Sequence, residues 1–150
     1  MSPALRGTLD RVAEAAAGLT GPWWVFGSAA ALLLGLDGLE PADVDLLAAP
    51  AEALALLERL GAPPQPKTHP RFRSEVFGTV ADTPLPVEVI GGFSVRTGEG
   101  WTRVRPQTRV LVGWGDLALA VPAAHEQARF CRLLGRPRDL ERAARLDALG

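Results

Sequence analysis

The sequence contains one cysteine, Cys131, and two histidines, His69 and His125, that lie far apart in the 150 residues. A single cysteine excludes an internal disulfide and a zinc cluster of cysteine thiolates, and two distant histidines argue against zinc. Cys131 falls in a predicted helix, where we expect a small apolar core residue. We expect His125 to be structural or exposed, and His69 to lie at the surface, with a substrate contact as its alternative.

Long apolar runs are also missing. No run approaches the roughly 20 residues that span a bilayer, and no basic-then-apolar leader opens the chain. The formal net charge of −1 provides no overall field that would attract nucleic acid or an anionic membrane. These absences predict a soluble, cytoplasmic protein with no membrane partner. Lysine is scarce beside abundant alanine, leucine and arginine, a bias we attribute to the nucleotide composition of the source.

The length favours one domain covering residues 1–150, because a chain of this size can bury one adequate core. Helices are predicted at 5–19, 28–34, 51–60, 122–134 and 138–149. Strands are predicted at 23–26, 44–48, 93–96, 101–104 and 110–112, with a hairpin over 71–90. Leu54, Leu57 and Leu60 are expected on the inner face of the third helix. The expected fold class is α/β (α+β), with a mixed, mostly antiparallel sheet and helices packed against it.

The central stretch begins with the apolar run Trp23–Phe26, which Gly27 and Ser28 separate from a predicted helix. Glycine permits a sharp turn and a close ligand, and the free N–H groups that open a helix suit a phosphate. The pattern therefore indicates a phosphate cradle at Gly27 and Ser28. A plain strand-to-helix turn with Ser28 as the N-cap is the alternative, and the two interpretations are compatible.

An acid pair follows in Asp43-Val44-Asp45-Leu46. The period of a strand sends Asp43 and Asp45 to one face, where the two carboxylates repel each other unless a cation lies between them. Oxygen ligands are those that Mg²⁺ prefers, so the pair is a candidate magnesium site. A solvent-exposed acid pair is the alternative.

A third acid, Glu88, lies in an apolar strand pattern. A charged side chain in a central strand is unfavourable to bury unless it is paired or bound to a metal, so Glu88 needs such a partner. The alternative is a glutamate on an edge strand that points to water. Glu75 and Asp82, on the same predicted hairpin, are weaker candidates.

Arg71 and Arg73 share one face of the predicted hairpin strand. Arginine forks pair well with phosphate, so both are candidates to contact a triphosphate or an anionic acceptor. A solvated strand face is the alternative.

These motifs resemble the nucleotidyltransferase superfamily of DNA polymerase β, which includes antibiotic nucleotidyltransferases and nucleotidyltransferases of toxin–antitoxin systems. The shared pattern is an apolar strand, Gly27-Ser28, a helix, then Asp43-Val44-Asp45-Leu46, and a later carboxylate at Glu88. The resemblance implies transfer of a nucleoside monophosphate from an NTP such as ATP to an acceptor, with two Mg²⁺ ions held by the three acids. It also implies that Glu88 accepts the proton of the acceptor.

A second resemblance lies in Gly135-Arg136-Pro137-Arg138-Asp139-Leu140, where small nucleotidyltransferases carry Gly-Arg-x-Lys-Asp-Leu. Arg138 stands where lysine is usual. We expect Asp139 to cap the last helix or to pair with Arg136.

The sequence leaves the acceptor open between a small molecule, a protein and RNA. Four arginines, Arg96, Arg103, Arg105 and Arg109, raise the RNA alternative, but interleaved acidic and neutral residues dilute the charge. Trp101 and Trp114 are expected to pack in the core or on strands. A catalytically silent module that binds a nucleotide or a protein partner is the alternative function.

Overall fold

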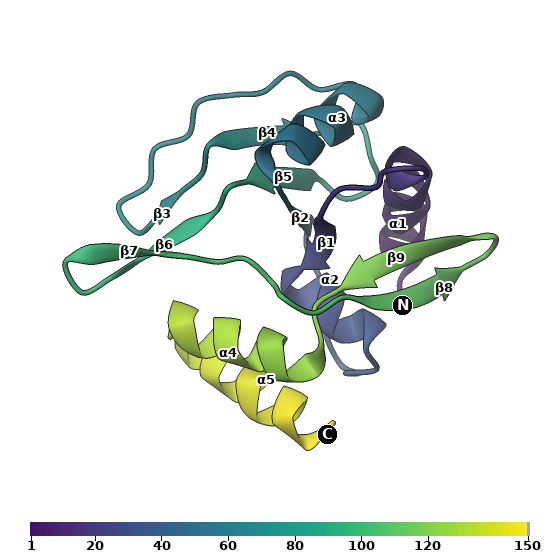
Figure 1. The fold of residues 1–150 in the computed structure, drawn as a ribbon. Coiled ribbons are helices and arrows are strands. Elements are labelled where there is room, and N and C mark those ends of the chain that lie inside the picture. Colours follow the sequence, from purple (N-terminus) through teal and green to yellow (C-terminus); the bar gives the residue numbers. More distant parts are fainter. Residues whose placement is uncertain (150) are drawn as a thin grey trace.

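Helices pack around a central four-stranded sheet, and two smaller sheets extend from it (Figure 1). The structure, a computed structural model, describes residues 1–149. The helices are α1 (Pro3–Ala16), α2 (Gly27–Leu33), α3 (Pro50–Leu60), α4 (Ala124–Leu134) and α5 (Pro137–Ala148). The strands are β1 (Trp23–Phe26), β2 (Val44–Ala48), β3 (Phe72–Arg73), β4 (Val76–Val80), β5 (Val87–Gly91), β6 (Ser94–Thr97), β7 (Gly100–Arg103), β8 (Val110–Trp114) and β9 (Leu117–Val121).

The central sheet has the strand order β1-β2-β5-β4. Only β2 and β5 pair in parallel, and the other neighbours are antiparallel, so the predicted mixed, mostly antiparallel α+β fold is confirmed. Val44 and Leu46 of β2 are fully buried in a core that includes residues of α1 and α3. Leu47 lies in a second core with Phe26 and Phe130. Alternation along β2 therefore places Asp45 on the same face as this second core.

The two smaller sheets are a three-stranded sheet β3-β6-β7 and the hairpin β8-β9. The ribbon of β6 and β7 projects from the body, and α4 and α5 lie beside each other below it (Figure 1). Cys131 of α4 is buried and His125 is exposed, as predicted. Among residues 1–149, no helix combines the length and hydrophobicity of a membrane span.

Glycines end two of the helices. Gly61 and Gly135 adopt left-handed conformations with φ of 81° and 73°, which glycine reaches without steric strain. Arg136 then caps α5, and its backbone N–H donates to Asp139 at 3.2 Å. The predicted capping role of Asp139 is confirmed, and it fixes the direction in which α5 leaves α4.

The predicted elements agree with the structure most closely around the apolar strands. The bounds of β1 and β2 match the predictions, and the helix ends differ from the predicted ones by at most three residues. Leu54 is 48% exposed, so its expected inward position is wrong. Ala53 and Leu56 take the inward positions with Leu57 and Leu60.

The strands between Arg71 and Val121 differ from the predicted strands in two ways. The first strand of the predicted hairpin was expected to run without a break over 71–78. The pairing instead changes partner between Arg73 and Val76: β3 pairs with β6, and β4 pairs with β5. The β4–β5 hairpin is present as predicted. The sequence interpretation missed β9, whose residues Leu119, Ala120 and Val121 are fully buried beside β1.

Candidate active site

The turn between β1 and α2 approaches the acid pair. Gly27 has a φ of 69°, a conformation that other residues adopt only with strain. A Cβ atom at Gly27 would lie 3.2 Å from Asp45 Oδ2, closer than ordinary packing allows. Phe26 occupies the N-cap position of α2, and no side chain caps this helix, so the alternative role of Ser28 as N-cap is wrong. Gly27 thus leaves room beside the Asp45 carboxylate.

Asp45 is the most perturbed carboxylate of the site. Its Oδ1 atom is buried, and no donor among the described residues reaches it. Burial, followed by the negative charges of Asp43 and Glu88, raises the pKa of Asp45 to about 7. The positive charges of Lys67 and Arg136 act in the opposite direction. Asp45 therefore lacks the partner that a buried carboxylate needs.

Glu88 lies directly beside Asp45, because the parallel register of β2 and β5 pairs the two residues. β5 runs between β2 and β4, so the alternative of an edge-strand glutamate is wrong. Glu88 Oε2 lies 4.0 Å from the Nζ atom of Lys67. The two weaker candidates lie elsewhere: Glu75 pairs with Arg103 at 3.0 Å, and Asp82 lies 3.9 Å from Arg11.

A pocket of about 540 Å³ joins these side chains. Its polar lining comprises Ser28, Glu40, Asp43, Asp45, Lys67, His69, Arg73, Ser74, Glu88, Arg136, Arg138 and Arg142, together with Gly27. Its apolar lining includes Phe26, Leu39, Phe72, Phe77, Ile90, Phe93 and Leu134. We call Asp43, Asp45 and Glu88 the acidic wall of this pocket. We call Lys67, Arg136, Arg138 and Arg142 its basic wall.

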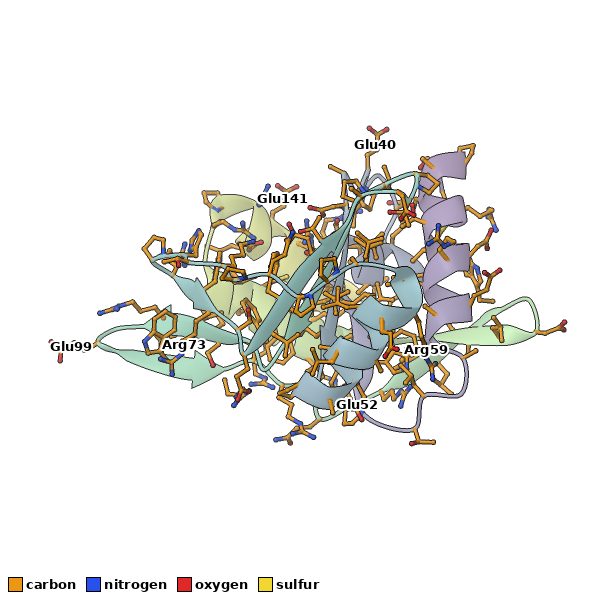
Figure 2. The ribbon with its side chains drawn as sticks, turned by 90° about the horizontal axis from the view of Figure 1, so that it is seen from above. Glu40, Glu52, Arg59, Arg73, Glu99 and Glu141 are labelled. Atoms are coloured by element: carbon orange, nitrogen blue, oxygen red, sulfur yellow. The ribbon has the colours of Figure 1, made fainter. Side chains whose placement is uncertain are left out.

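The two predicted arginines have different positions. Arg73 contributes to the pocket lining, and its guanidinium lies over the ring of Trp101 at 4.5 Å. Figure 2 shows Arg73 extending over the β6–β7 ribbon, with Glu99 at the ribbon's end. Arg71 does not line the pocket: its Nη2 atom donates to the Leu134 carbonyl at 2.8 Å. Of the two predicted arginines, Arg73 is therefore the one that a pocket ligand could contact.

The sequence interpretation missed most of the basic wall. Arg136 is held by Asp139, with 2.6 Å between Nε and Oδ2, and the Asp139 carboxylate is buried. The Nε atom of Arg142 is buried, and none of residues 1–149 supplies it with a hydrogen-bond partner. Arg138 and Arg142 are four residues apart on α5, a spacing that places both on one helix face and could have indicated them. His69, expected at the surface, lines the pocket and stacks on Phe72 at 4.5 Å.

Asp43, Asp45 and Glu88 are candidate ligands of a divalent cation. In the described part of the chain, no three histidine, cysteine, aspartate or glutamate side chains form a ready-made metal cluster. Asp45 nevertheless presents a buried oxygen without a donor, beside Asp43 and an unobstructed glycine. A hard cation with oxygen ligands suits this pair of acids. The donor set therefore fits a divalent cation at Asp43 and Asp45, with Glu88 engaged by Lys67 in this conformation.

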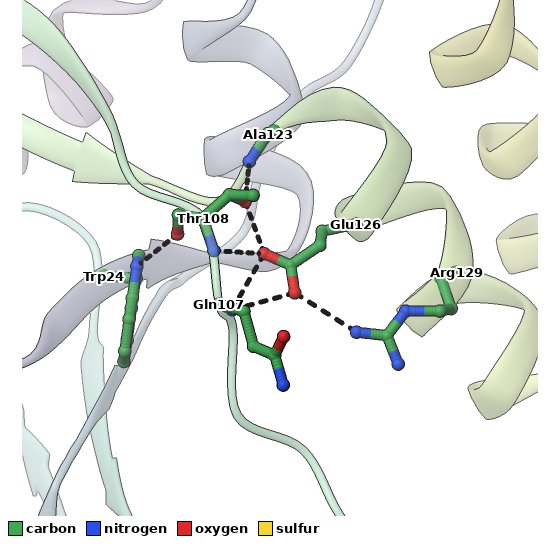
Figure 3. Close-up of polar contacts among 6 residues, drawn as sticks. All are labelled: Trp24, Gln107, Thr108, Ala123, Glu126 and Arg129. Atoms are coloured by element: carbon green, nitrogen blue, oxygen red, sulfur yellow. Dashed lines mark hydrogen bonds and ion pairs between the residues drawn. The ribbon is translucent and has the colours of Figure 1, made fainter.

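Another buried carboxylate, Glu126, lies outside the pocket and was also missed (Figure 3). It accepts hydrogen bonds from the backbone N–H groups of Gln107 and Thr108 and from Arg129 at 3.1 Å. The Thr108 hydroxyl also donates to Glu126 and accepts from the N–H of Ala123. Burial would raise the pKa of Glu126, but these hydrogen bonds outweigh it and lower the pKa. Glu126 fastens the segment before β8 to the start of α4.

No protein-family model and no curated protein matches the sequence. Solved structures do match. A candidate nucleotidyltransferase of Thermotoga maritima, TM1012, is 18% identical, with a TM-score of 0.74 over 89% of this chain and 86% of that chain. The antibiotic-resistance factor ANT(2'')-Ia is 14% identical, with a TM-score of 0.62 over 100% of this chain and 86% of that chain.

The lincosamide antibiotic adenylyltransferase LnuA, in its lincomycin-bound structure, is also similar. It is 13% identical, with a TM-score of 0.56 over 95% of this chain and 96% of that chain. At these identities the matches show the fold alone. The chain has the nucleotidyltransferase fold, and the predicted resemblance is confirmed at that level.

Proposed function

We propose that this protein is a Mg²⁺-dependent nucleotidyltransferase that moves a nucleoside monophosphate from an NTP to an acceptor and releases pyrophosphate. The observation that carries the proposal is Asp45, whose buried Oδ1 atom no donor in residues 1–149 reaches and whose pKa is raised to about 7. Burying an ionised carboxylate without a partner is unfavourable for the folded protein, and a bound cation removes this unfavourable contribution. Asp45 lines a pocket that basic residues also line, and such a pocket suits a metal–triphosphate ligand.

The chain's own residues have distinct roles in this proposal. Asp43 and Asp45 would hold two Mg²⁺ ions, and Glu88 would add the third carboxylate and accept the proton of the acceptor hydroxyl. Gly27 and Ser28 allow the triphosphate to approach the acids. Bound divalent ions supply electrostatic stabilisation of the attacking and leaving oxygens.

The basic wall completes the binding of nucleotide. Arg138 and Arg142 project into the pocket from α5, and Arg136 is fixed beside them by Asp139. Arginine guanidinium groups match phosphate oxygens in geometry as well as charge. We expect Arg73 to contribute at the pocket edge, where its stacking on Trp101 restricts it. The triphosphate would thus lie between an acidic and a basic wall.

The acceptor stays open between a small molecule, a protein and RNA. Arg96 and Trp101 are register partners on the ribbon, and the guanidinium of Arg96 lies 5.8 Å from the Trp101 ring. Arg109 lies over Trp23, away from the ribbon, so the four arginines weighed for RNA are not one surface. These arginines therefore do not decide between the acceptors, and the transfer assay described below would identify the acceptor.

The second candidate function is a catalytically silent module that binds nucleotide. The observation that favours it is the contact between Lys67 and Glu88, which leaves the third carboxylate neutralised by the protein itself. A silent module would bind nucleotide without transferring it to any acceptor.

The test is incubation of the protein with each α-labelled NTP, Mg²⁺ and cell extract, followed by identification of the labelled product. Asp45→Asn is the inactive variant, and Asp82→Asn is the matched control, because Asp82 is an exposed acid outside the pocket. We expect label transfer by the wild type and Asp82→Asn only. Calorimetry without Mg²⁺-dependent binding of any NTP would overturn the proposal, and binding without transfer would favour the silent module.

A further inference from the structure

The connection between α3 and β3, residues 61–71, runs around the β4 edge of the central sheet (Figure 1). Proline fixes its own φ angle, and four prolines stiffen this connection: Pro63, Pro64, Pro66 and Pro70. The backbone N–H of Gln65 donates to the carbonyl of Phe77 on β4 at 2.7 Å. A stiff segment pinned to the sheet therefore carries the next side chains over the pocket.

Lys67 and His69 both lie on this segment and line the pocket, and Lys67 is the one that contacts an acid of the site. Its ammonium group lies 4.2 Å from the centroid of the Phe77 ring and 4.0 Å from Glu88 Oε2. The side chain is 41% exposed, so it contacts the acids while remaining accessible to a ligand. Lys67 is also the single lysine of the chain, beside fifteen arginines.

We propose that Lys67 is a positioning residue with two alternating partners: Glu88 in the empty site, and the triphosphate of the bound nucleotide. This inference rests on the proposed function. In the empty site, Lys67 offsets the repulsion among Asp43, Asp45 and Glu88. When Glu88 turns to a divalent cation, Lys67 leaves it, because two cations repel at this distance. The stiff segment keeps the released ammonium group in the pocket, where the triphosphate is the available anion.

The chemistry of lysine suits this exchange. An arginine fork pairs with a carboxylate through two parallel hydrogen bonds, as a fixed partner does. The ammonium group is a single compact charge, and its contact with Glu88 is at the outer limit of an ion pair. Arg136 illustrates the fixed case, since it pairs with Asp139 through two nitrogen atoms. Lys67 is therefore the cation of the basic wall best suited to change partners.

The test compares the binding of Mn²⁺ alone, as a probe of the divalent site, in the wild type, Lys67→Met and Lys67→Arg. Removing the competing ammonium should tighten Mn²⁺ binding about fivefold. Lys67→Arg should weaken it, because the fork holds Glu88 more firmly. Arg132→Met is the matched control, since it removes a cation from an exposed pair with Asp147 outside the pocket and should leave Mn²⁺ binding unchanged.

The second arm measures binding of a non-hydrolysable ATP analogue with Mg²⁺. Lys67→Met should weaken this binding about tenfold, opposite in sign to its effect on Mn²⁺ alone. Equal or weaker Mn²⁺ binding in Lys67→Met, or unchanged binding of the analogue, would overturn the inference. If the wild type itself binds Mn²⁺ no better than Asp45→Asn, the proposed function fails instead, so the two failures are distinguishable.

Because Lys67 is the single lysine of the chain, chemical labelling of amines can report on its accessibility. The aldehyde of pyridoxal phosphate condenses with a free amine, releases water, and is fixed as a secondary amine when borohydride supplies hydride. Labelling should occur at Lys67, and the ATP analogue with Mg²⁺ should protect Lys67 but not the amino terminus. Equal labelling of Lys67 with and without the analogue would contradict the assignment of the triphosphate as its second partner.

Discussion

Asp45 and Glu126 are two acids with buried carboxylate oxygens and opposite surroundings. Glu126 accepts from two backbone N–H groups, from the Thr108 hydroxyl and from Arg129, which together lower its pKa. Asp45 Oδ1 has no donor within the part of the chain that the structure describes, and burial and neighbouring acids raise the Asp45 pKa to about 7. The protein therefore solvates one carboxylate internally and leaves the other without a partner.

The different numbers of hydrogen-bond donors around Glu126 and Asp45 indicate different roles for the two carboxylates. A carboxylate with its full set of donors stabilises the fold, here by joining the segment before β8 to α4. A carboxylate without donors opposes folding unless something else binds it. The surroundings of Asp45 include the pocket and a glycine that allows close approach, whereas Glu126 lies outside the pocket. We infer that Glu126 serves the architecture and Asp45 serves a ligand.

The largest expected effect is on transfer. Asp45→Asn should reduce nucleotidyl transfer by about 10³-fold or more, because in the proposed function it would remove a ligand of the divalent ions that stabilise the reacting oxygens. Single-turnover assays with Mg²⁺ measure it. Asp82→Asn should retain wild-type rates, and substantial transfer by Asp45→Asn would remove the distinction between the two carboxylates.

The second largest expected effect is that of a Glu126 substitution on the free energy of unfolding. Glu126→Gln should lower the free energy of unfolding at pH 7 by about 2–4 kcal/mol, because it leaves buried donors without a charged acceptor. The folded-state pKa of Glu126 lies below its ordinary value, so this contribution is present above that value and is lost as the pH falls through the folded pKa. Denaturant unfolding at pH 7 and pH 3 measures it. An equal loss at both pH values would contradict the account.

Asp45 should show the reverse dependence. Its folded-state pKa of about 7 lies above the ordinary aspartate pKa of about 3.9, so the folded state is favoured at low pH and loses this contribution as the pH rises through that interval. Without divalent cations, Asp45→Asn should stabilise the protein by about 1–3 kcal/mol at pH 8 and by much less at pH 4. Unfolding measured in EDTA tests this prediction, and destabilisation at pH 8 would count against it.

The smallest expected effect on stability is at Glu88. Glu88→Gln should nearly eliminate transfer, yet stabilise the metal-free protein less than Asp45→Asn does, because Lys67 already offsets the Glu88 charge. Glu75→Gln and Asp82→Asn should leave transfer within a few-fold of wild type, since both acids lie outside the pocket. Full activity in Glu88→Gln would mean that the third carboxylate is another residue.

The acidic wall could be predicted from the sequence because its parts are local. The apolar run Trp23–Phe26, the glycine after it and the alternation of Asp43 and Asp45 each depend on residues close in the chain. Glu88 also followed from the two-residue period of its strand. Its pairing with Asp45 depends on the parallel register of β2 and β5, which only the structure shows.

The basic wall depends on contacts between distant segments. Lys67 reaches the acids because its segment is pinned to β4, and Arg142 faces the pocket because Asp139 and Gly135 set the direction of α5. The alternation of one strand made Arg71 a candidate phosphate contact. In the structure, β3 pairs with β6 and Arg71 donates to the Leu134 carbonyl, so Arg71 does not line the pocket. These placements follow from packing, which a periodic pattern does not encode.

The most direct test of the unpartnered carboxylate is an NMR titration of the Asp45 carboxyl carbon, assigned with Asp45→Asn, with and without Mg²⁺ and a non-hydrolysable NTP analogue. The midpoint should lie near pH 7 in the metal-free protein and should fall clearly when the cation and nucleotide bind. A midpoint near the ordinary aspartate value, or one that cation and nucleotide leave unchanged, would contradict this prediction.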